Sequence, residues 1–390
     1  MRRPVIRRSH RLRCCNQNAL EVQERMTGVN KHSEELKGWA ATGLVWVGVD
    51  LGDRQANWAA VDGVGEFREG KVAVSDEGLR ELFGDAPHCR VVLEAGTHTP
   101  WVARALKGLG HEAVVVDARI LATHRRRRKN DRGDARRLME VGREMDYKRV
   151  PQVWQRPEAN QEELTLVRMR DALVRSRGLL VNSLRGAVKP HGERLGSHSS
   201  ASLARFGRVA LSPRMQALGE PAFCAVEALN QQLRRYDERV AEQLARRQES
   251  ERLLQVHGVG PVTVAVFMAV VGDPRRFRRS RDVAAYLGLA PLQQQSGEHD
   301  PQLGISKAGN GLARRVLVQC AHYILGLNGQ DSALRRWGLA MAGDGKNQAR
   351  KRKAVIAVAR KLAVLLLRLW VSGERYEPLR GVPVEEGAVA

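Results

Sequence analysis

Residues 44–144 alternate between short β-rich segments and amphipathic ones, and this order restricts the fold more than any other feature of the chain. Three β-rich segments come first, each bounded by Gly, Asp or Asn: LVWVGVDLG, NWAAVDGVGEF and REGKVAVS. There follow a helix over 76–83, the strand CRVVLEAG, a helix over 100–109, the strand EAVVVDA and a helix containing DRGDARRLMEVG. This order predicts an α/β sheet of the ribonuclease H type, whose chemistry lies at strand ends and on the last helix.

Four carboxylates fall where such a sheet would bring them together. Asp50 ends the first predicted strand, in VGVDLG, and Glu94 ends the fourth, in VVLEAG. A carboxylate at the edge of a buried sheet is costly without a partner. Asp131 and Asp134, in KNDRGDA, are three residues apart on a predicted helix and therefore share one face.

Oxygen ligands of this kind favour Mg²⁺ or Mn²⁺ over zinc, and a paired-metal site can hold the attacking and leaving oxygens of a phosphodiester. The competing interpretation is structural, since an Asp at a strand end is commonly a turn residue and Asp131 could be an N-cap. The joint placement of four carboxylates favours a metal site. Asp53, Asp62 and Asp117 also lie near strand ends and are substitutes if the register differs.

The chain is strongly basic, with 65 Lys and Arg against 43 Asp and Glu and a formal net charge of +22. Such a charge favours a polyanionic partner, nucleic acid first. Five consecutive basic residues come directly before the paired aspartates: Arg125, Arg126, Arg127, Arg128 and Lys129. A charge run is usually a solvated face. Beside a metal site it would hold a nucleic-acid backbone, with salt-dependent affinity and no base specificity.

Several other classes of protein are disfavoured. The longest uncharged apolar stretch, 262–271, is too short to cross a bilayer, and the basic N-terminus lacks the apolar core of a signal peptide. The five cysteines show no CxxC pairing. We therefore expect a reduced, cytoplasmic protein with no membrane partner, in which residues 1–42 form a basic disordered extension.

The second half of the chain is predicted to be helical. Apolar residues recur at near-heptad spacing over 158–188 and again over 226–244, and the Gly-, Ser- and Pro-rich residues 191–221 between them indicate a loop. An antiparallel or dimerising helical arm and a simple helical bundle explain this pattern equally well. The predicted domains are a sheet domain over 43–150, a helical arm over 151–250, a mostly α domain over 251–375 and a tail over 376–390.

The C-terminal domain opens with LLQVHGVGPVTVAVFMAVVG, which predicts a helix, a glycine-containing hairpin and a second helix. In such a helix-hairpin-helix-like element, the amides of Gly258, Val259 and Gly260 could bind a phosphate. A tight turn between two helices with no ligand is an equally good interpretation.

Ser296 lies in Gln-Ser-Gly on a polar loop between helical segments. No GxSxG elbow surrounds it, and spacing alone assigns it no base, although Glu298 and His299 are local candidates. In the following segment, ISKAGNGLARRVL, we expect Lys307 and Arg314 to contact nucleic acid.

In their order and approximate spacing, the motifs VGVDLG, LEAG, KNDRGDA, HGVGPVTV, RFRRSRDVAAYLGLAP, QSG and ISKAGNGLARRVL resemble those of the insertion sequence 110 family of transposases. The resemblance covers roughly residues 44–370. It implies a Holliday-junction-resolvase-like N-terminal DEDD domain and a C-terminal transposase domain with a nucleophilic serine. By position, the DEDD carboxylates would be Asp50, Glu94, Asp131 and Asp134, and the nucleophile would be Ser296.

The resemblance also implies a mechanism and partners. A composite site from both domains would cut donor and target DNA with Mg²⁺, and the serine would become covalently joined to a strand end. A noncoding bridge RNA would choose the DNA by base pairing, and the protein would assemble into dimers or tetramers on nucleoid DNA. Two alternatives remain: a metal-dependent junction nuclease that uses water, and a non-catalytic basic nucleic-acid-binding protein.

Overall fold

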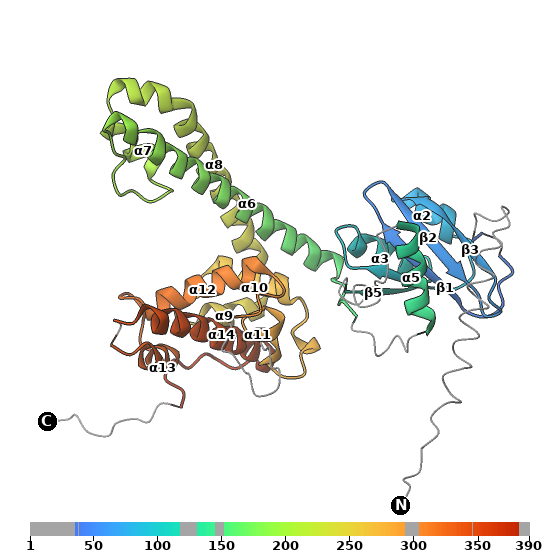
Figure 1. The fold of residues 1–390 in the computed structure, drawn as a ribbon. Helices are drawn as coiled ribbons and strands as arrows, with labels where there is room; N and C mark the ends of the chain where they lie inside the picture. The colour runs from blue at the N-terminus through green and yellow to red at the C-terminus, as the bar shows by residue number, and fades with distance from the viewer. Residues whose placement is uncertain are drawn as a thin grey trace, which may run out of the picture. The chain divides into compact units, whose positions relative to one another are not determined.

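The computed structural model describes residues 36–37, 39–117, 131–144, 152–292, 304–344 and 346–381. The chain forms two compact units, Met1–Arg156 and Pro157–Ala390 (Figure 1). Each unit is described by itself.

The first unit contains a mixed five-stranded sheet with the strand order β3-β2-β1-β4-β5. Its strands are β1 (Val45–Leu51), β2 (Gln55–Val61), β3 (Phe67–Ala73), β4 (Cys89–Glu94) and β5 (Glu112–Val116), and its helices are α2 (Asp76–Phe83), α3 (Thr99–Gly108) and α5 (Asp131–Glu144). β1, β2 and β3 are antiparallel neighbours, whereas β4 runs parallel to β1 and to β5. This element order confirms the prediction, and the sheet is compatible with a ribonuclease H-like fold.

The two faces of the sheet are covered by different helices. On one face, Val47 and Leu93 pack with Phe83 of α2 and Leu106 of α3 in a single apolar cluster. On the other face, Val92 and strand β5 pack against Leu138 and Val141 of α5. The alternation of side chains along a strand separates the two clusters. Residues two apart on a strand therefore face the same helices.

The second predicted strand, NWAAVDGVGEF, is too long. β2 ends at Val61, and the chain turns at Asp62, whose buried carboxylate accepts the backbone N–H groups of Thr42 (3.0 Å), Val64 (3.1 Å) and Glu66 (2.8 Å). This is a turn-stabilising role for a short acidic side chain.

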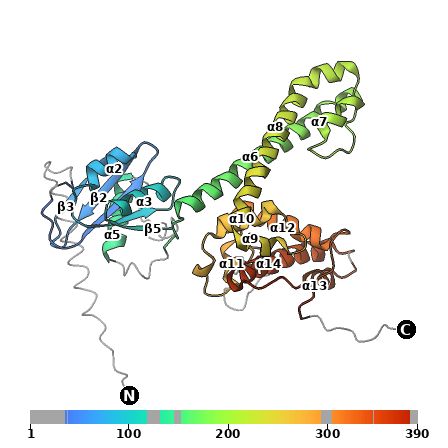
Figure 2. The same ribbon diagram turned by 180° about the vertical axis from the view of Figure 1, so that it is seen from behind.

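In the second unit, α6 (Glu158–Ala187) and α8 (Pro213–Ala245) run side by side (Figure 2). The short elements η1 (Lys189–His191), α7 (Leu203–Phe206) and η2 (Arg208–Ala210) connect them. Between the helices, Arg170 Nε donates to Asp237 (2.7 Å) and Arg177 Nη1 donates to Asn230 (2.8 Å). The two long amphipathic helices of the prediction are therefore confirmed.

The predicted loop over 191–221 is wrong at its C-terminal end. Helix α8 begins at Pro213 because Ser212 accepts the Met215 N–H as N-cap and proline is well tolerated in the first turn. Pro221 lies inside the helix, where proline cannot donate to the carbonyl of Ala217. The burial of Phe223 and Val226 against the short elements stabilises the helix across this missing hydrogen bond.

The remaining elements of this unit are α9 (Gln248–Leu254), α10 (Pro261–Val271), η3 (Pro274–Arg276), α11 (Asp282–Tyr286), α12 (Gly311–Leu325), α13 (Ala333–Ala342) and α14 (Gln348–Ser372). Helix α10 is apolar all round, and its residues from Thr263 to Val271 are buried. A helix of this composition belongs in the centre of a core. Within the part of the chain that the structure describes, no helix is long and apolar enough to span a bilayer.

Candidate functional site

The pairing of β1 with β4 places two predicted site carboxylates next to each other. Val49 lies opposite Leu93 in the parallel register, and the same offset brings Asp50 beside Glu94. Asp50 is two residues after Gly48, and Glu94 is two residues after Val92. Both carboxylates therefore belong to the face of the sheet that α5 covers.

Helix α5 approaches this face unusually closely at Gly48. A Cβ atom at Gly48 would lie 2.1 Å from the Ala135 carbonyl oxygen and 2.3 Å from the Met139 backbone nitrogen. Only a residue without a side chain allows two backbones to come this near. Asp134 directly precedes Ala135, so this contact fixes the position of its backbone over β1.

Asp134 is 7% exposed, and its Oδ1 accepts a hydrogen bond from Arg137 Nη1 at 2.9 Å. Its carboxylate is therefore paired with a cation one turn further along the helix. Asp131 opens α5, and its side chain lies outside the described part of the structure. Among the described residues, no three His, Cys, Asp or Glu side chains gather closely enough to hold a metal ion. Asp50, Glu94 and Asp134 are therefore on the side of the sheet that α5 covers, but these three described carboxylates do not form a closed metal site.

The three substitute carboxylates differ in their surroundings. The Asp53 side chain is 91% exposed and lies 3.3 Å from His98 Nε2, and Asp62 is committed to the turn after β2. Asp117 follows Val116, which lies opposite Glu94 in the register of β4 and β5. Asp53 and Asp62 therefore have roles of their own that need no metal.

Several predicted site residues lie outside the described residues. These are the basic run Arg125, Arg126, Arg127, Arg128 and Lys129, and Ser296 with its neighbours Glu298 and His299. Their roles stay predictions.

The glycine-containing hairpin connects α9 to α10. Gly258 has φ +83°, and a Cβ there would lie 2.8 Å from Ile324 Cγ1 and 3.0 Å from Tyr323 Cδ1. Gly258 is thus needed for packing against α12, independently of any ligand. Gly260 is the N-cap of α10, with no atom within 4 Å of its Cβ position, so a ligand has room to approach. A phosphate contact at Gly260 remains a prediction.

Of the two basic residues after the Ser296 segment, Arg314 has a structural task. Its Nη1 donates to the backbone carbonyls of Ala308 (2.6 Å), Leu287 (3.0 Å) and Gly309 (3.2 Å), which ties α12 to the preceding loop. Lys307 is exposed and has φ +54°. Contact of either residue with nucleic acid is still a prediction.

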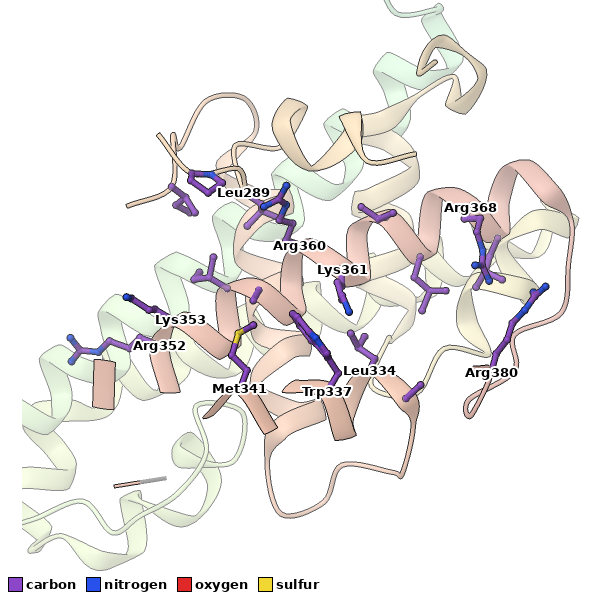
Figure 3. Close-up of a pocket in the computed structure, with 18 of the residues that line it drawn as sticks. Leu289, Leu334, Trp337, Met341, Arg352, Lys353, Arg360, Lys361, Arg368 and Arg380 are labelled. Carbon is purple, nitrogen blue, oxygen red and sulfur yellow. The ribbon is translucent and has the colours of Figure 1, made fainter. Parts of the chain in front are cut away.

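Sequence reasoning missed a groove between α13 and α14 with a volume of about 1510 Å³ (Figure 3). We call it the α13–α14 groove. Seven basic residues and one acidic residue, Glu377, line it; the basic ones are Lys307, Arg352, Lys353, Arg360, Lys361, Arg368 and Arg380. One sequence feature could have indicated this groove. Cations of α14 lie on the same helix face as the partly buried Ile356 and Val364, whereas an amphipathic helix usually has only apolar residues on its buried face.

The described residues on either side of the Ser296 segment line this groove. Pro291 and Ile305 form an antiparallel bridge, and the Leu292 N–H donates to the Gly304 carbonyl at 2.8 Å. All four of these residues line the groove. The residues that flank 293–303 in the sequence are thus held together at the groove.

Comparisons with known proteins match both units. The family model of the DEDD_Tnp_IS110 transposase matches residues 47–191, and that of the Transposase IS116/IS110/IS902 family matches residues 250–334. A protein of Sinorhizobium fredii named as a transposase, y4rJ, is 30% identical over 71% of this chain and 75% of its own length.

Two further relatives are named for insertion sequences. The transposase for insertion sequence element IS1328 of Yersinia enterocolitica is 28% identical over 66% of this chain and 78% of its own length. The transposase for insertion sequence element IS1111A of Coxiella burnetii is 30% identical over 60% of this chain and 65% of its own length. With two family models matched in order and relatives aligned over most of their lengths, the chain belongs to the IS110 family of insertion-sequence transposases.

Proposed function

We propose that this protein cuts and rejoins DNA in a reaction that depends on Mg²⁺ or Mn²⁺ and uses Ser296 as the nucleophile. The observation that carries the proposal is the β1–β4 register, which sets Asp50 beside Glu94 on the face that α5 covers. The close contact at Gly48 brings Asp134 to the same face. In this proposal the N-terminal unit acts as a resolvase-like ribonuclease H domain whose acidic residues bind the metal.

The residues fit a hard divalent cation by their chemistry. Asp50, Glu94 and Asp134 offer only oxygen donors, which hard divalent cations prefer, and the buried Asp134 already pairs with one positive charge, that of Arg137. Asp131, one helical turn earlier, would complete the set. A bound ion supplies charge stabilisation for the phosphodiester as its bond breaks. Arg137 would release Asp134 to the ion and become available to a DNA phosphate.

The reaction itself is a transesterification. The Ser296 Oγ attacks the phosphorus of one DNA linkage and gives its hydroxyl proton to a general base. The bond between phosphorus and the departing DNA oxygen breaks, and that oxygen takes up a proton to leave a strand with a free hydroxyl. The phosphoserine ester retains the energy of the broken linkage, so that a second DNA hydroxyl can reverse the step and rejoin strands. Water as the nucleophile would give cleavage without this intermediate.

The partners follow from the same proposal. Donor and target DNA are the substrates, and a noncoding bridge RNA selects them by base pairing, since phosphate contacts give no sequence information. Assembly into dimers or tetramers through α6 and α8 would bring two sites to one junction. In this proposal Gly260, at the start of α10 in a helix-hairpin-helix-like element, would contribute one phosphate contact of this kind.

The test is a denaturing gel of the full-length protein with labelled junction DNA, target DNA, the element's RNA and Mg²⁺. Wild type is expected to give a covalent protein–DNA band that Ser296→Ala lacks and that Asp50→Asn, Glu94→Gln and Asp134→Asn reduce at least a hundredfold. Asp53→Asn, which removes an exposed carboxylate two residues beyond β1, is the matched control and should behave as wild type.

Three results would point elsewhere. Cleavage by Ser296→Ala at the wild-type rate selects the nuclease that uses water. Salt-sensitive binding without cleavage in any metal selects the non-catalytic binding protein. If Asp53→Asn loses as much cleavage as Asp50→Asn, then cleavage depends on negative charge in this region and not on the proposed set of metal-binding carboxylates.

A further inference from the structure

The α13–α14 groove is lined by apolar and basic side chains. Its apolar floor includes the half-buried Leu334, Trp337, Ile356 and Val364. Seven cations and one carboxylate, Glu377, also line it, and two of the cations, Arg368 and Arg380, pair with Glu374. A volume of about 1510 Å³ exceeds that of ordinary small-molecule sites, which are roughly 300–1,000 Å³. The groove therefore has the size and charge for an extended polyanion.

The cations of α14 follow the length of the groove. Lys353, the adjacent pair Arg360 and Lys361, and Arg368 follow one another at intervals of about two turns on the face that carries Ile356 and Val364. From Lys353 to Arg368 the helix rises about 22 Å, at about 1.5 Å per residue. At roughly 3.4 Å per nucleotide of a stacked strand, this length corresponds to about six nucleotides, and an unstacked, more extended strand would place fewer along it. Arg352 and Arg360 form no ion pair with any residue that the structure describes.

An aromatic side chain lies in the middle of this row. The Lys361 ammonium is 3.6 Å from the centroid of the Trp337 ring and covers one face of the indole. A ligand that stacks on this face must displace the ammonium. Gly338 next to it permits close contact between the helices, since a Cβ there would lie 2.5 Å from Val358 Cγ2. Because that contact fixes α13 against α14, it also fixes the position of the Trp337 backbone beside the groove.

We propose that the α13–α14 groove binds single-stranded DNA, with Trp337 as a stacking platform for one base and the α14 cations as partners of the phosphates. A base that stacks on the indole takes the place of the Lys361 ammonium, which then pairs with the adjacent phosphate. This inference rests on the proposed function, because it assigns the groove to the strand that the Ser296 segment cuts.

Two observations favour a single DNA strand over other occupants. An apolar floor of this kind suits unstacked bases, which a duplex keeps inside its stack, and a peptide segment would not need seven cations. Leu292 and Gly304, which flank the segment 293–303 in the sequence, also line the groove. A strand in the groove therefore contacts the described residues on either side of the segment that contains the proposed nucleophile.

The test measures binding of fluorescein-labelled oligothymidylate by the full-length protein, without metal, over a range of salt concentrations. Trp337→Ala should weaken binding by about 5- to 150-fold with little change in salt dependence, because stacking is not ionic. Trp337→Phe should recover part of the affinity. Arg360→Gln should lower the slope of log affinity against log salt by about 0.7. Leu339→Ala on α13 and Arg350→Gln on α14, both exposed and outside the groove, are the matched controls.

Each contrary outcome has one meaning. Wild-type affinity in Trp337→Ala, with its helical circular dichroism intact, would overturn the inference. Tighter binding of oligouridylate that Trp337→Ala abolishes would assign the groove to RNA, and a change of oligomeric state in Trp337→Ala would assign it to a second copy of the chain. If wild type forms the Ser296 adduct while Trp337→Ala binds normally, only this inference fails. If the groove binds as expected but no adduct forms, the proposed function fails and the groove assignment stands.

Discussion

The substitution Gly48→Ala tests how the site carboxylates are held together. A methyl group there would lie 2.1 Å from the Ala135 carbonyl oxygen, 2.3 Å from the Met139 nitrogen and 2.8 Å from Leu138 Cβ. Ordinary contact is about 3.4 Å or more, so α5 must move away from β1 by roughly 1.3 Å. Overpacking of this kind costs about 1–3 kcal/mol in unfolding free energy. Asp134 would move with the helix relative to Asp50 and Glu94.

Calorimetry of the full-length protein should therefore show a melting temperature lowered by roughly 5–15 °C for the transition of the sheet unit, at about 5 °C per kcal/mol for its size. DNA cleavage should fall further, by about a hundredfold, since a shift of about 1 Å in a catalytic group has effects of that order. Gly108→Ala at the end of α3, where no atom lies within 4 Å of the Cβ position, is the control and should keep full cleavage. Gly48→Ala with wild-type melting and cleavage would refute this account of the packing.

Three further outcomes are expected. Asp62→Ala should lower the unfolding free energy of the sheet unit by about 2–4 kcal/mol, because three backbone N–H groups lose their acceptor. The fraction of the protein that remains folded should still cleave DNA. A variant that keeps full stability but loses cleavage would instead show a catalytic role for Asp62. Burial lowers the pKa of His111, whose Nδ1 accepts the Cys89 N–H and whose Nε2 is bonded to the Phe83 carbonyl. The unfolded chain thus takes up this proton at higher pH than the folded one, so stability should fall as the pH drops below about 6.5, by at most about 1.4 kcal/mol per pH unit. His111→Gln should flatten that dependence in melts between pH 7 and 5, and an unchanged slope would exclude His111 as its source. Burial raises the pKa of the Cys89 thiol to about 12 and also raises that of Cys320, so iodoacetamide should label exposed Cys224 in the native protein but Cys89 and Cys320 only after unfolding, as read by peptide mass mapping; early labelling of Cys89 would contradict its burial.

The order of elements in the sheet unit could be predicted because each segment has one clear periodicity. Asp50 and Glu94 were identified as site candidates because both follow apolar strands, and the parallel pairing of β1 with β4 places them together. The role of Asp62 could not be predicted, since its partner Thr42 is twenty residues away and the hydrogen bonds are to backbone atoms. A strand-end aspartate looks the same in sequence whether it binds a metal ion or stabilises a turn.

The helical unit shows a second limit. Pro221 and its neighbours suggested a loop, but the tertiary burial of Phe223 and Val226 outweighs the lost hydrogen bond, and local propensity contains no information on such burial. The α13–α14 groove was missed for a related reason. Trp337 and Arg360 belong to different helices, and neither residue is unusual within its own helix. Only the packing of α13 against α14 shows that both line one groove.

The covering of the sheet by α5 has a consequence for synthesis of the protein. All five strands precede α5 in the chain, and until it is made the face with Val92, Val114 and Val116 has no cover. A nascent chain that stops before Asp131 therefore presents an uncovered apolar sheet face, which favours aggregation or capture by chaperones. Asp134 also lies on α5. A mutated copy of the insertion sequence whose protein product ends before Asp131 would therefore lose both its solubility and its carboxylate site.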